Sequence, residues 1–425
     1  MTKTILNSDE FEEFFYEKER EEFDIDGSQI HETKISNLHI TEDVTFNNFS
    51  FDRKTIFENC IFENDLNLIG LEVNYIIKFD NCQINNKIYI FNSEFKSTLC
   101  FCDISTKDLE IQTSIFNFGI IFKNITCNGI IYFKNISVFK IPISFNENDN
   151  INRVEFNFGP ESTGDFNIKN TSINTLILKG INNKSSILIS DCNIEKIALV
   201  RFYNYNLLEL INIKCTSNLS AKFYIKKSQL NKTVFQDINF NNYETTIIDS
   251  NFSEIIATNI IWPKKIYCAK ESNSNPKKLK EIYQQFKQVT LKQGDIFSSL
   301  VFKSLEMNAH YKSTSWKNNF SDKFIILTNR YSNYHGLNWL RCLGWIMSTN
   351  LIYFTLIYGF GKNMPISLEV NDIFKTISDY IKFINPIHDN NKELDGFYIF
   401  IDTVSRILNS YFIFQFLRAF RKFTI

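Results

Sequence analysis

The sequence predicts a mainly β fold, in which a right-handed parallel β-helix is followed by an α-helical hairpin and two transmembrane helices. Three features lead to this prediction. Apolar residues recur with a short fixed spacing in the first third of the chain, helical periodicity replaces that spacing after residue 262, and two long apolar segments lie near the C-terminus. A chain of 425 residues with 13 Gly and 6 Pro is long enough for two or three structural units and is not collagen-like.

The repeat has a period of about eleven residues. It places apolar or small residues at Val44, Thr55, Leu66, Ile77, Ile88, Leu99, Leu109, Ile120 and Ile131. A single unit cannot bury its own apolar face, so the units must stack around a continuous core. Two units would form one coil of about 22 residues, which puts each side chain above its counterpart in the previous coil. We expect six side chains in that core: Phe57, Cys60, Phe62, Phe79, Cys82 and Ile84.

Polar pairs such as Asp80-Asn81 and Lys123-Asn124 separate the apolar positions and suit a bend. The runs from Ile56 to Phe62 and from Phe79 to Ile84 resemble the pentapeptide-repeat proteins, whose quadrilateral coils stack a Phe or Leu and a small residue inward. That family has shorter, Ala-rich coils, whereas these coils carry Ile and Phe. The resemblance implies a pentapeptide-like solenoid.

The solenoid is expected over residues 27–262, with an N-terminal capping helix over residues 1–26. Ser8-Asp9 is a helix start signal, and the helix that follows carries Phe11, Phe14 and Phe15 at helical spacing. A cap would cover the open end of the stack; an acidic docking arm is the alternative. Beyond residue 140 the spacing becomes irregular, and we expect a loop between residues 146 and 164.

Residues 263–336 are expected to form a basic helical linker. Apolar residues follow helical spacing over Pro276–Lys292, and Gly294-Asp295 separates this segment from a second one over Ile296–Tyr311. The pattern is typical of an antiparallel helical hairpin.

Residues 337–425 are expected to form a two-span transmembrane region. The first span lies within Leu337–Phe360 and the second within Phe397–Phe420, which contains the polar residues Asp402, Arg406, Asn409 and Gln415. Basic residues precede the first span and follow the second: Arg330, Arg341, Arg418, Arg421 and Lys422. This distribution predicts that both termini are cytoplasmic. An amphipathic helix over Ile373–Ile384 would lie on the outer membrane surface, and a soluble helical core remains the alternative to the spans.

Segments of the C-terminal third, including Ser332–Arg341 and Phe414–Lys422, resemble bacterial membrane proteins that join a pentapeptide-like solenoid to a two-span tail. The resemblance covers about residues 276–425. It implies an inner (cytoplasmic) membrane location, with the lipid bilayer as a partner and no known chemistry.

No pattern of catalytic, metal-binding or cofactor-binding residues is found. The five His are scattered, and the nine Cys lack metal spacing and are expected as reduced core residues. Cys100 and Cys102 share one strand face, for which we expect a core position, with a metal or redox role as the alternative. The net charge of −1 gives no indication of nucleic acid, and we expect none as a partner.

Two non-enzymatic functions fit these features. The first is a membrane-anchored scaffold or sensor whose cytoplasmic β-helix binds an unknown protein partner. The second is an oligomeric pore or channel-like effector, of phage defence for example, gated by the solenoid; it is suggested by Asp402 and Arg406 and makes the chain a homo-oligomer. A β-helix carbohydrate-active enzyme is the least favoured alternative, because acidic residues on the repeat faces are dispersed.

Overall fold

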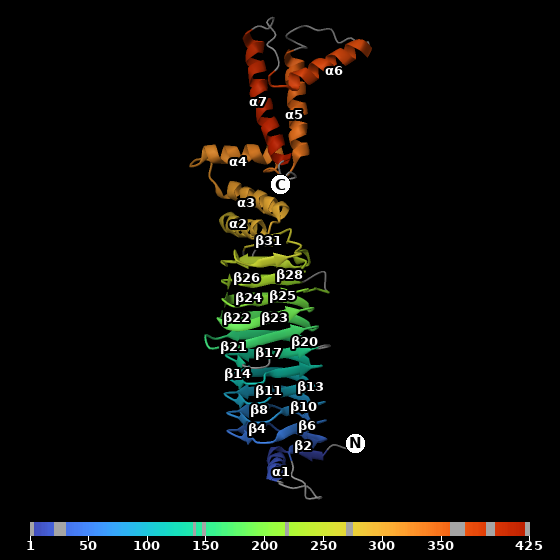
Figure 1. The fold of residues 1–425 in the computed structure, drawn as a ribbon, viewed down its shortest axis with the longest axis vertical. Coiled ribbons are helices and arrows are strands. Elements are labelled where there is room, and N and C mark those ends of the chain that lie inside the picture. The colour runs from blue at the N-terminus through green and yellow to red at the C-terminus, as the bar shows by residue number, and fades with distance from the viewer. Residues whose placement is uncertain are drawn as a thin grey trace. The chain divides into compact units, whose positions relative to one another are not determined.

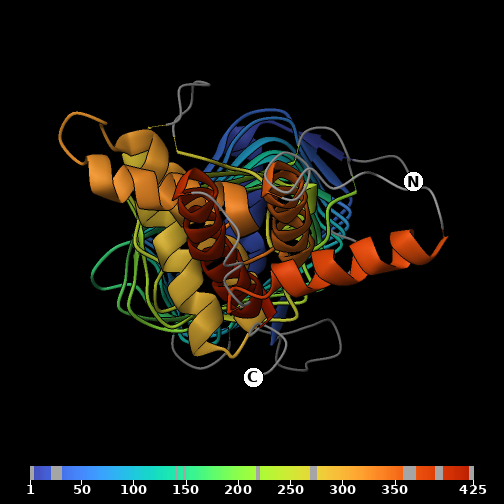
Figure 2. The ribbon, with the colours of Figure 1, turned by 90° about the horizontal axis from the view of Figure 1, so that it is seen from above.

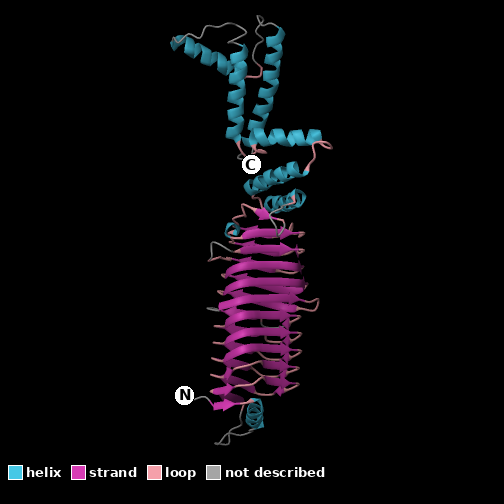
Figure 3. Ribbon diagram, turned by 180° about the vertical axis from the view of Figure 1, so that it is seen from behind, coloured by secondary structure: helices cyan, strands magenta, loops and turns pink. Residues whose placement is uncertain are grey.

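The computed structural model describes residues 4–20, 31–138, 142–146, 150–216, 221–268, 275–357, 370–387 and 396–420. The chain divides into two compact units, Met1–Ser274 and Asn275–Ile425. The first unit is a stack of β-strands and the second is helical (Figures 1 and 3). The predicted parallel β-solenoid followed by helices is therefore confirmed.

All pairings between described strands are parallel, in two sheets of 15 and 16 strands. The first sheet contains β1 (Thr4–Leu6), β3 (Leu38–Ile40), β4 (Val44–Asn47), β7 (Ile61–Phe62), β8 (Leu66–Ile69), β11 (Gln83–Phe91), β14 (Ser105–Gln112), β17 (Thr126–Lys134), β20 (Asn150–Phe158), β22 (Ser172–Asn182), β24 (Asn193–Asn204), β26 (Lys222–Lys226), β27 (Gln229–Leu230), β29 (Glu244–Ile248) and β31 (Ile266–Tyr267). The second contains β2 (Glu32–Ser36), β5 (Ser50–Phe51), β6 (Lys54–Glu58), β9 (Glu72–Val73), β10 (Ile77–Asp80), β12 (Glu94–Phe95), β13 (Leu99–Cys102), β15 (Ile115–Phe116), β16 (Ile120–Lys123), β18 (Ser137–Val138), β19 (Ile143–Asn146), β21 (Thr163–Lys169), β23 (Lys184–Ser190), β25 (Leu208–Ile211), β28 (Thr233–Gln236) and β30 (Ile256–Thr258).

The core of the solenoid is a set of side-chain stacks along its length. Phe57 pairs in register with Phe79, and Phe79 with Phe101. Their rings are stacked, with centroids 4.8 and 5.3 Å apart. The nine positions of the eleven-residue repeat and the six core side chains expected from it are all buried. Each coil thus adds apolar area to the surface that the previous coil left exposed.

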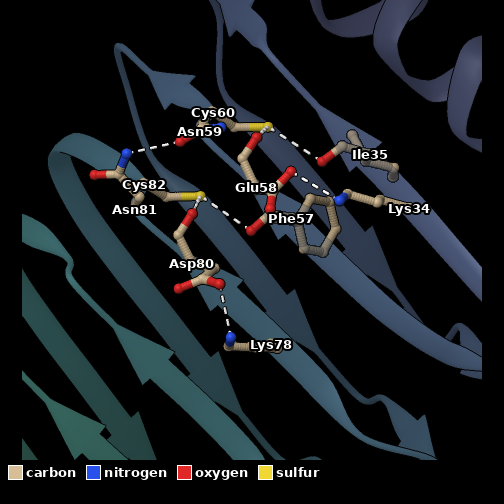
Figure 4. Close-up of polar contacts among 10 residues, drawn as sticks. All are labelled: Lys34, Ile35, Phe57, Glu58, Asn59, Cys60, Lys78, Asp80, Asn81 and Cys82. Carbon is tan, nitrogen blue, oxygen red and sulfur yellow. Dashed lines mark hydrogen bonds and ion pairs between the residues drawn. The ribbon is translucent and has the colours of Figure 1, made fainter.

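The coils bend at residues in the left-handed αL conformation, which Asn tolerates better than other residues with a side chain. Asn59 and Asn81 have φ of 55° and 50°. The Asn81 side-chain amide donates to Oδ1 of Asn59, 22 residues earlier, at 2.6 Å (Figure 4). Asn124 bonds to Asp103 in the same way. At another bend Gly70 (φ 61°) takes this conformation, and a Cβ there would lie 2.3 Å from Oδ1 of Asn48. The predicted bends therefore also connect one coil to the next.

The buried thiols beside these bends lie in the core and donate hydrogen bonds to backbone carbonyls of the preceding coil. Cys60 donates to the carbonyl of Ile35, and Cys82 donates to that of Phe57 at 3.3 Å (Figure 4). The hydrogen bond with Cys60 and burial together raise the pKa of the Cys82 thiol. Cys100 and Cys102 differ from the prediction. They are half-buried on the outward side of β13, because the inward positions of that strand belong to Leu99 and Phe101. Burial raises the pKa of Cys100 to about 11, which opposes thiolate chemistry.

Helix α1 (Ser8–Arg20) packs on the N-terminal coil (Figure 1). Its Phe11 and Phe15 are fully buried, and the Phe15 ring lies 4.8 Å from that of Phe46. The cap differs in detail from the prediction: Asn7 accepts from the Glu10 backbone N–H and Glu10 accepts from that of Asn7, so Asn7, before Ser8, caps the helix. Residues 21–26, the rest of the predicted capping segment, lie outside the described residues.

The structure differs from the expected solenoid at two places. The expected loop between residues 146 and 164 contains β20, whose register with β17 continues the stack. Thr126 pairs with Asn150 and Phe133 with Phe156. At the C-terminal end of the solenoid, β31 lies beyond residue 262 and pairs with β29. In both places the apolar residues keep alternating, although the spacing between coils changes.

The helical unit contains α2 (Pro276–Lys292), α3 (Ile296–Ser313), α4 (Phe320–Asn333), α5 (Trp339–Phe354), α6 (Val370–Ile384) and α7 (Gly396–Phe420). Helices α2 and α3 form the predicted hairpin, joined by stacked Phe286 and Phe302 rings and by the Lys287–Glu306 ion pair at 2.6 Å. Helix α4 crosses one end of the α5–α7 pair, and α6 projects from the other end (Figures 1 and 2).

Replacing Phe79 by Ala should lower the free energy of unfolding by about 3–5 kcal/mol, because its stacked neighbours cannot close the gap. Lys78→Ala, an outward change on the same strand, should cost less than about 1 kcal/mol. Urea unfolding followed by circular dichroism would measure both. Equal effects of the two changes would contradict the eleven-residue register.

Candidate functional site: a polar seam within an apolar helix pair

Helices α5 and α7 pack against each other in antiparallel directions (Figure 1). Among the described residues, Trp339–Ile357 is the one helical segment with the length and apolar composition to cross a membrane. Its 19 residues would extend about 28 Å, close to the thickness of the hydrocarbon core. Helix α7 has 25 residues but is not such a segment, and the polar residues Asp402, Arg406, Asn409 and Gln415 interrupt its apolar sequence. The prediction of two spans is therefore not confirmed.

Helix α7 buries polar side chains and exposes apolar ones. Its buried residues are Asp402, Ser405, Asn409, Gln415 and Ala419. Its outer face instead carries Phe400 and Ile407, which are 67% and 65% exposed. The pattern of α7 is the reverse of that of a helix in water, where the apolar stripe faces the core. It is the pattern expected in lipid, where polar groups must find partners inside the bundle. Helix α5 buries Asn350 together with Cys342, Ile346 and Phe354.

Asn350 and Asn409 form a reciprocal amide pair between α5 and α7. The Asn350 amide donates to Oδ1 of Asn409 at 2.6 Å, and the Asn409 amide donates back to Oδ1 of Asn350. The two residues are 0% and 1% exposed. Each side chain thus provides a donor and an acceptor for the other, so neither amide is left unpaired away from water.

A second polar group joins α7 to α4 and to the turn after it. The Asn333 amide donates to Oε1 of Gln415 at 2.7 Å, and the Gln415 amide donates to Oδ1 of Asn329 at 3.0 Å. Asn333 also accepts from the Gly336 backbone N–H through Oδ1, which fixes the turn between α4 and α5. Gln415 is therefore one of the residues that fasten α4 to the helix pair.

Asp402 and Arg406 form an ion pair within α7, four residues apart. The Arg406 Nε–H donates to Oδ2 of Asp402 at 2.9 Å. Side-chain exposure is 11% for Asp402 and 24% for Arg406. The structure therefore places the predicted intramembrane polar residues in three separate groups, each with its own partners. The sequence analysis missed Asn350, Asn333 and Asn329, although Asn350 interrupts the most apolar run of the chain.

Basic and aromatic residues gather at the end of the helix pair that α4 crosses. The Arg341 guanidinium lies 5.7 Å from the ring of Tyr334, and that of Arg330 lies 5.6 Å from the ring of Tyr311. Burial, together with Arg330 and Arg418, lowers the pKa of His335 to about 4. Arg330 and Arg418 are therefore close enough to the same imidazole to act on it electrostatically. The other two basic residues expected to set the topology, Arg421 and Lys422, lie outside the described residues.

At the opposite end α6 packs on the pair through Phe383, which contacts Phe354 and Ile357. The Tyr380 hydroxyl donates to the Met347 carbonyl at 2.8 Å. The rest of α6 exposes an apolar stripe: Ile373, Phe374, Ile377 and Ile381. The predicted amphipathic helix is therefore present, with its apolar side unpartnered in the described residues.

On the solenoid, one outer face combines tyrosines with an ion cluster. Glu155, 7% exposed, contacts Arg153 at 2.5 Å and Lys179 at 2.6 Å. Burial alone would raise the pKa of Glu155, but the hydrogen bonds from Lys179 and Arg153 outweigh it and lower that pKa. The register places Tyr132 and Ile177 on either side of Glu155, and the same column continues through Ala198 to Tyr224. Both tyrosines are half-buried, so this outer face carries partly exposed rings beside a fixed ion cluster.

No group of three or more His, Cys, Asp or Glu with metal-binding geometry occurs among the described residues. Comparison with protein-family models, with curated proteins and with solved structures finds no match to this chain.

Replacing Asn409 by Leu should destabilise the helix pair by about 1–2 kcal/mol, because the buried Asn350 amide loses its partner. The double change Asn350→Leu with Asn409→Leu should recover much of that loss. Unfolding titrations in detergent, combined as a double-mutant cycle, would measure the coupling. If the two single effects simply add, the pair has no energetic role.

Proposed function

We propose that the protein is a membrane-anchored scaffold or sensor, in which α5 and α7 form a two-span anchor and the β-solenoid binds a protein partner in the cytoplasm. The observation that carries the proposal is the reversed polarity of α7, which buries polar side chains and exposes large apolar ones. Water would favour the opposite arrangement, since large exposed apolar surfaces are rare on soluble monomers. The membrane would be the bacterial inner membrane, as the resemblance of the C-terminal third to two-span tails implies.

The proposed orientation follows from the basic residues. Arg330, Arg341 and Arg418 lie at the end of the pair that contains the start of α5 and the end of α7. Because basic residues are retained on the cytoplasmic side, both termini would be cytoplasmic. Helix α6 would then lie on the outer surface, with its apolar stripe in the lipid interface.

For partner binding we propose the outer face of the solenoid around Glu155. The parallel stack holds Tyr132, Ile177 and Tyr224 in one column of successive coils. Because their backbone is fixed, little conformational entropy would be lost when a partner binds.

The pore is the second candidate, and it rests on the half-buried pair of Asp402 and Arg406. Two helices cannot enclose a conduit, so a pore needs several copies of the chain. The amide pair of Asn350 and Asn409 fills the space between α5 and α7 within one chain. This favours the scaffold over the pore.

The two-span topology can be tested by cysteine labelling of the full chain. Lys317→Cys lies in an exposed position near the basic end, and Ile387→Cys is at a position 86% exposed near the opposite end. With a membrane-impermeant maleimide, Ile387→Cys should react in intact cells and Lys317→Cys only after permeabilisation. The unsubstituted protein measures background from native thiols. Equal labelling of both positions in intact cells, or recovery of the chain in the soluble fraction, would overturn the anchor.

The scaffold and the pore predict different effects of neutralising α7. The double change Asp402→Leu with Arg406→Leu should leave membrane insertion and thermal stability unchanged or slightly improved, because an internal ion pair is often no better than apolar residues. Vesicles containing the unsubstituted protein should show no ion flux. Flux that the double change abolishes would favour the pore.

A further inference from the structure

A groove runs between α4 and the α5–α7 pair at the basic end. Its volume is about 680 Å³, and it is open to the outside. The lining is largely apolar and includes Phe324, Ile325, Trp345, Ile407 and Phe412. Its floor is rigid, because the rings of Trp345 and Phe412 stack in parallel with centroids 5.9 Å apart.

The proposed two-span anchor places the groove at the cytoplasmic end of the helix pair. Helix α4 crosses the end of the pair and presents Phe324, Ile325 and Tyr331 outward. The Trp345 indole N–H donates to the Tyr331 carbonyl at 3.0 Å, which ties α4 to α5. In a membrane this corner would lie where acyl chains of the cytoplasmic leaflet meet their headgroups, the depth preferred by Trp and Tyr.

The polar groups of the groove suit an anion. Arg418 is the single charged residue of the lining, and it makes no ion pair with a described residue. Ser332 and Tyr411 also line the groove, and their buried hydroxyls have no hydrogen-bond partner among the described residues. Ser332 is 2% exposed. Guanidinium and hydroxyl groups donate hydrogen bonds that phosphate oxygens accept. The lining contains no acidic side chain that would repel a phosphate.

We propose that this groove binds an anionic phospholipid of the cytoplasmic leaflet, with the phosphate at Arg418 and an acyl chain along Ile407 and Phe412 against α4. The proposal rests on the membrane anchor. The apolar length of the groove favours a lipid over free phosphate, which would leave that surface uncovered. Basic pockets beside membrane helices on the cytoplasmic side recognise acidic headgroups in this way.

Trp345 allows lipid binding to be measured directly, because brominated acyl chains quench a tryptophan that they contact. The full chain is reconstituted in vesicles of phosphatidylcholine and phosphatidylglycerol, with either lipid brominated. The signal of Trp345 is the difference from Trp345→Phe. Quenching of that signal should show about a fivefold preference for the anionic lipid, the size expected for one basic residue at the surface.

Arg418→Gln should abolish the preference, and Arg341→Gln is the matched control, because it removes a charge from the same end but not from the groove. Tyr411→Phe should reduce the preference without changing the apolar lining. Added inorganic phosphate should have no effect. Equal quenching by both lipids, or an equal loss in the two arginine variants, would overturn the lipid site while leaving the anchor intact. Failure of the unsubstituted chain to enter vesicles would instead contradict the anchor.

Discussion

Each coil of the solenoid must return directly above the previous one, and this constraint determines most of the N-terminal unit. The rings of Phe57, Phe79 and Phe101 stack on one another only when the coils are aligned. This apolar contact stabilises the aligned stack, and no single coil can make it alone. The αL bends make the return sterically possible. Where Asn81 bonds to Asn59, the same residue turns the chain and holds two coils in register. A strongly apolar sequence is thereby restricted to one alignment, since a slip by one residue would turn every core side chain outward.

In the proposed anchor, the helical unit faces lipid instead of water. In lipid the apolar side chains gain little by meeting one another, so association depends on close packing and on polar groups that need partners. Asn350 with Asn409, and Gln415 with Asn333, supply such groups at two levels of α7. The first holds α5 against α7, and the second fastens α4 to the pair. The contacts that assemble the helices therefore also form the groove between α4 and the α5–α7 pair.

The sequence predicted the solenoid well because its signal is local and repeated. An apolar residue every eleven positions is visible without knowledge of distant contacts, and the polar pairs around Asn81 marked the bends. What it could not supply was the partner of each bend, since Asn59 is a coil away. Cys100 was misplaced although its neighbour Leu99 is a position of the repeat: side chains alternate along a strand, so an inward Leu99 places Cys100 outward. The extra strand β20 was missed because its coil departs from the regular spacing.

For the candidate site the sequence identified Asp402, Arg406, Asn409 and Gln415 but not their partners. Asn350 was overlooked because a single amide hardly lowers the hydropathy of an apolar run, whereas its cost without a partner in lipid is large. The position of α4 could not be predicted either, because it depends on a contact between residues 333 and 415.

The partners also explain why the helix pair suits an anchor better than a conduit. A group that lines a conduit must keep hydrogen-bonding capacity for water or ions. Asn350 and Asn409 instead direct a donor and an acceptor at each other across the interface, and the Arg406 Nε–H donates to a carboxylate one turn away. Such internal pairing lowers the cost of polar groups in lipid without requiring another chain. In the proposed function, two helices closed in this way would be complete as an anchor, and the role of the protein would depend on what its solenoid binds.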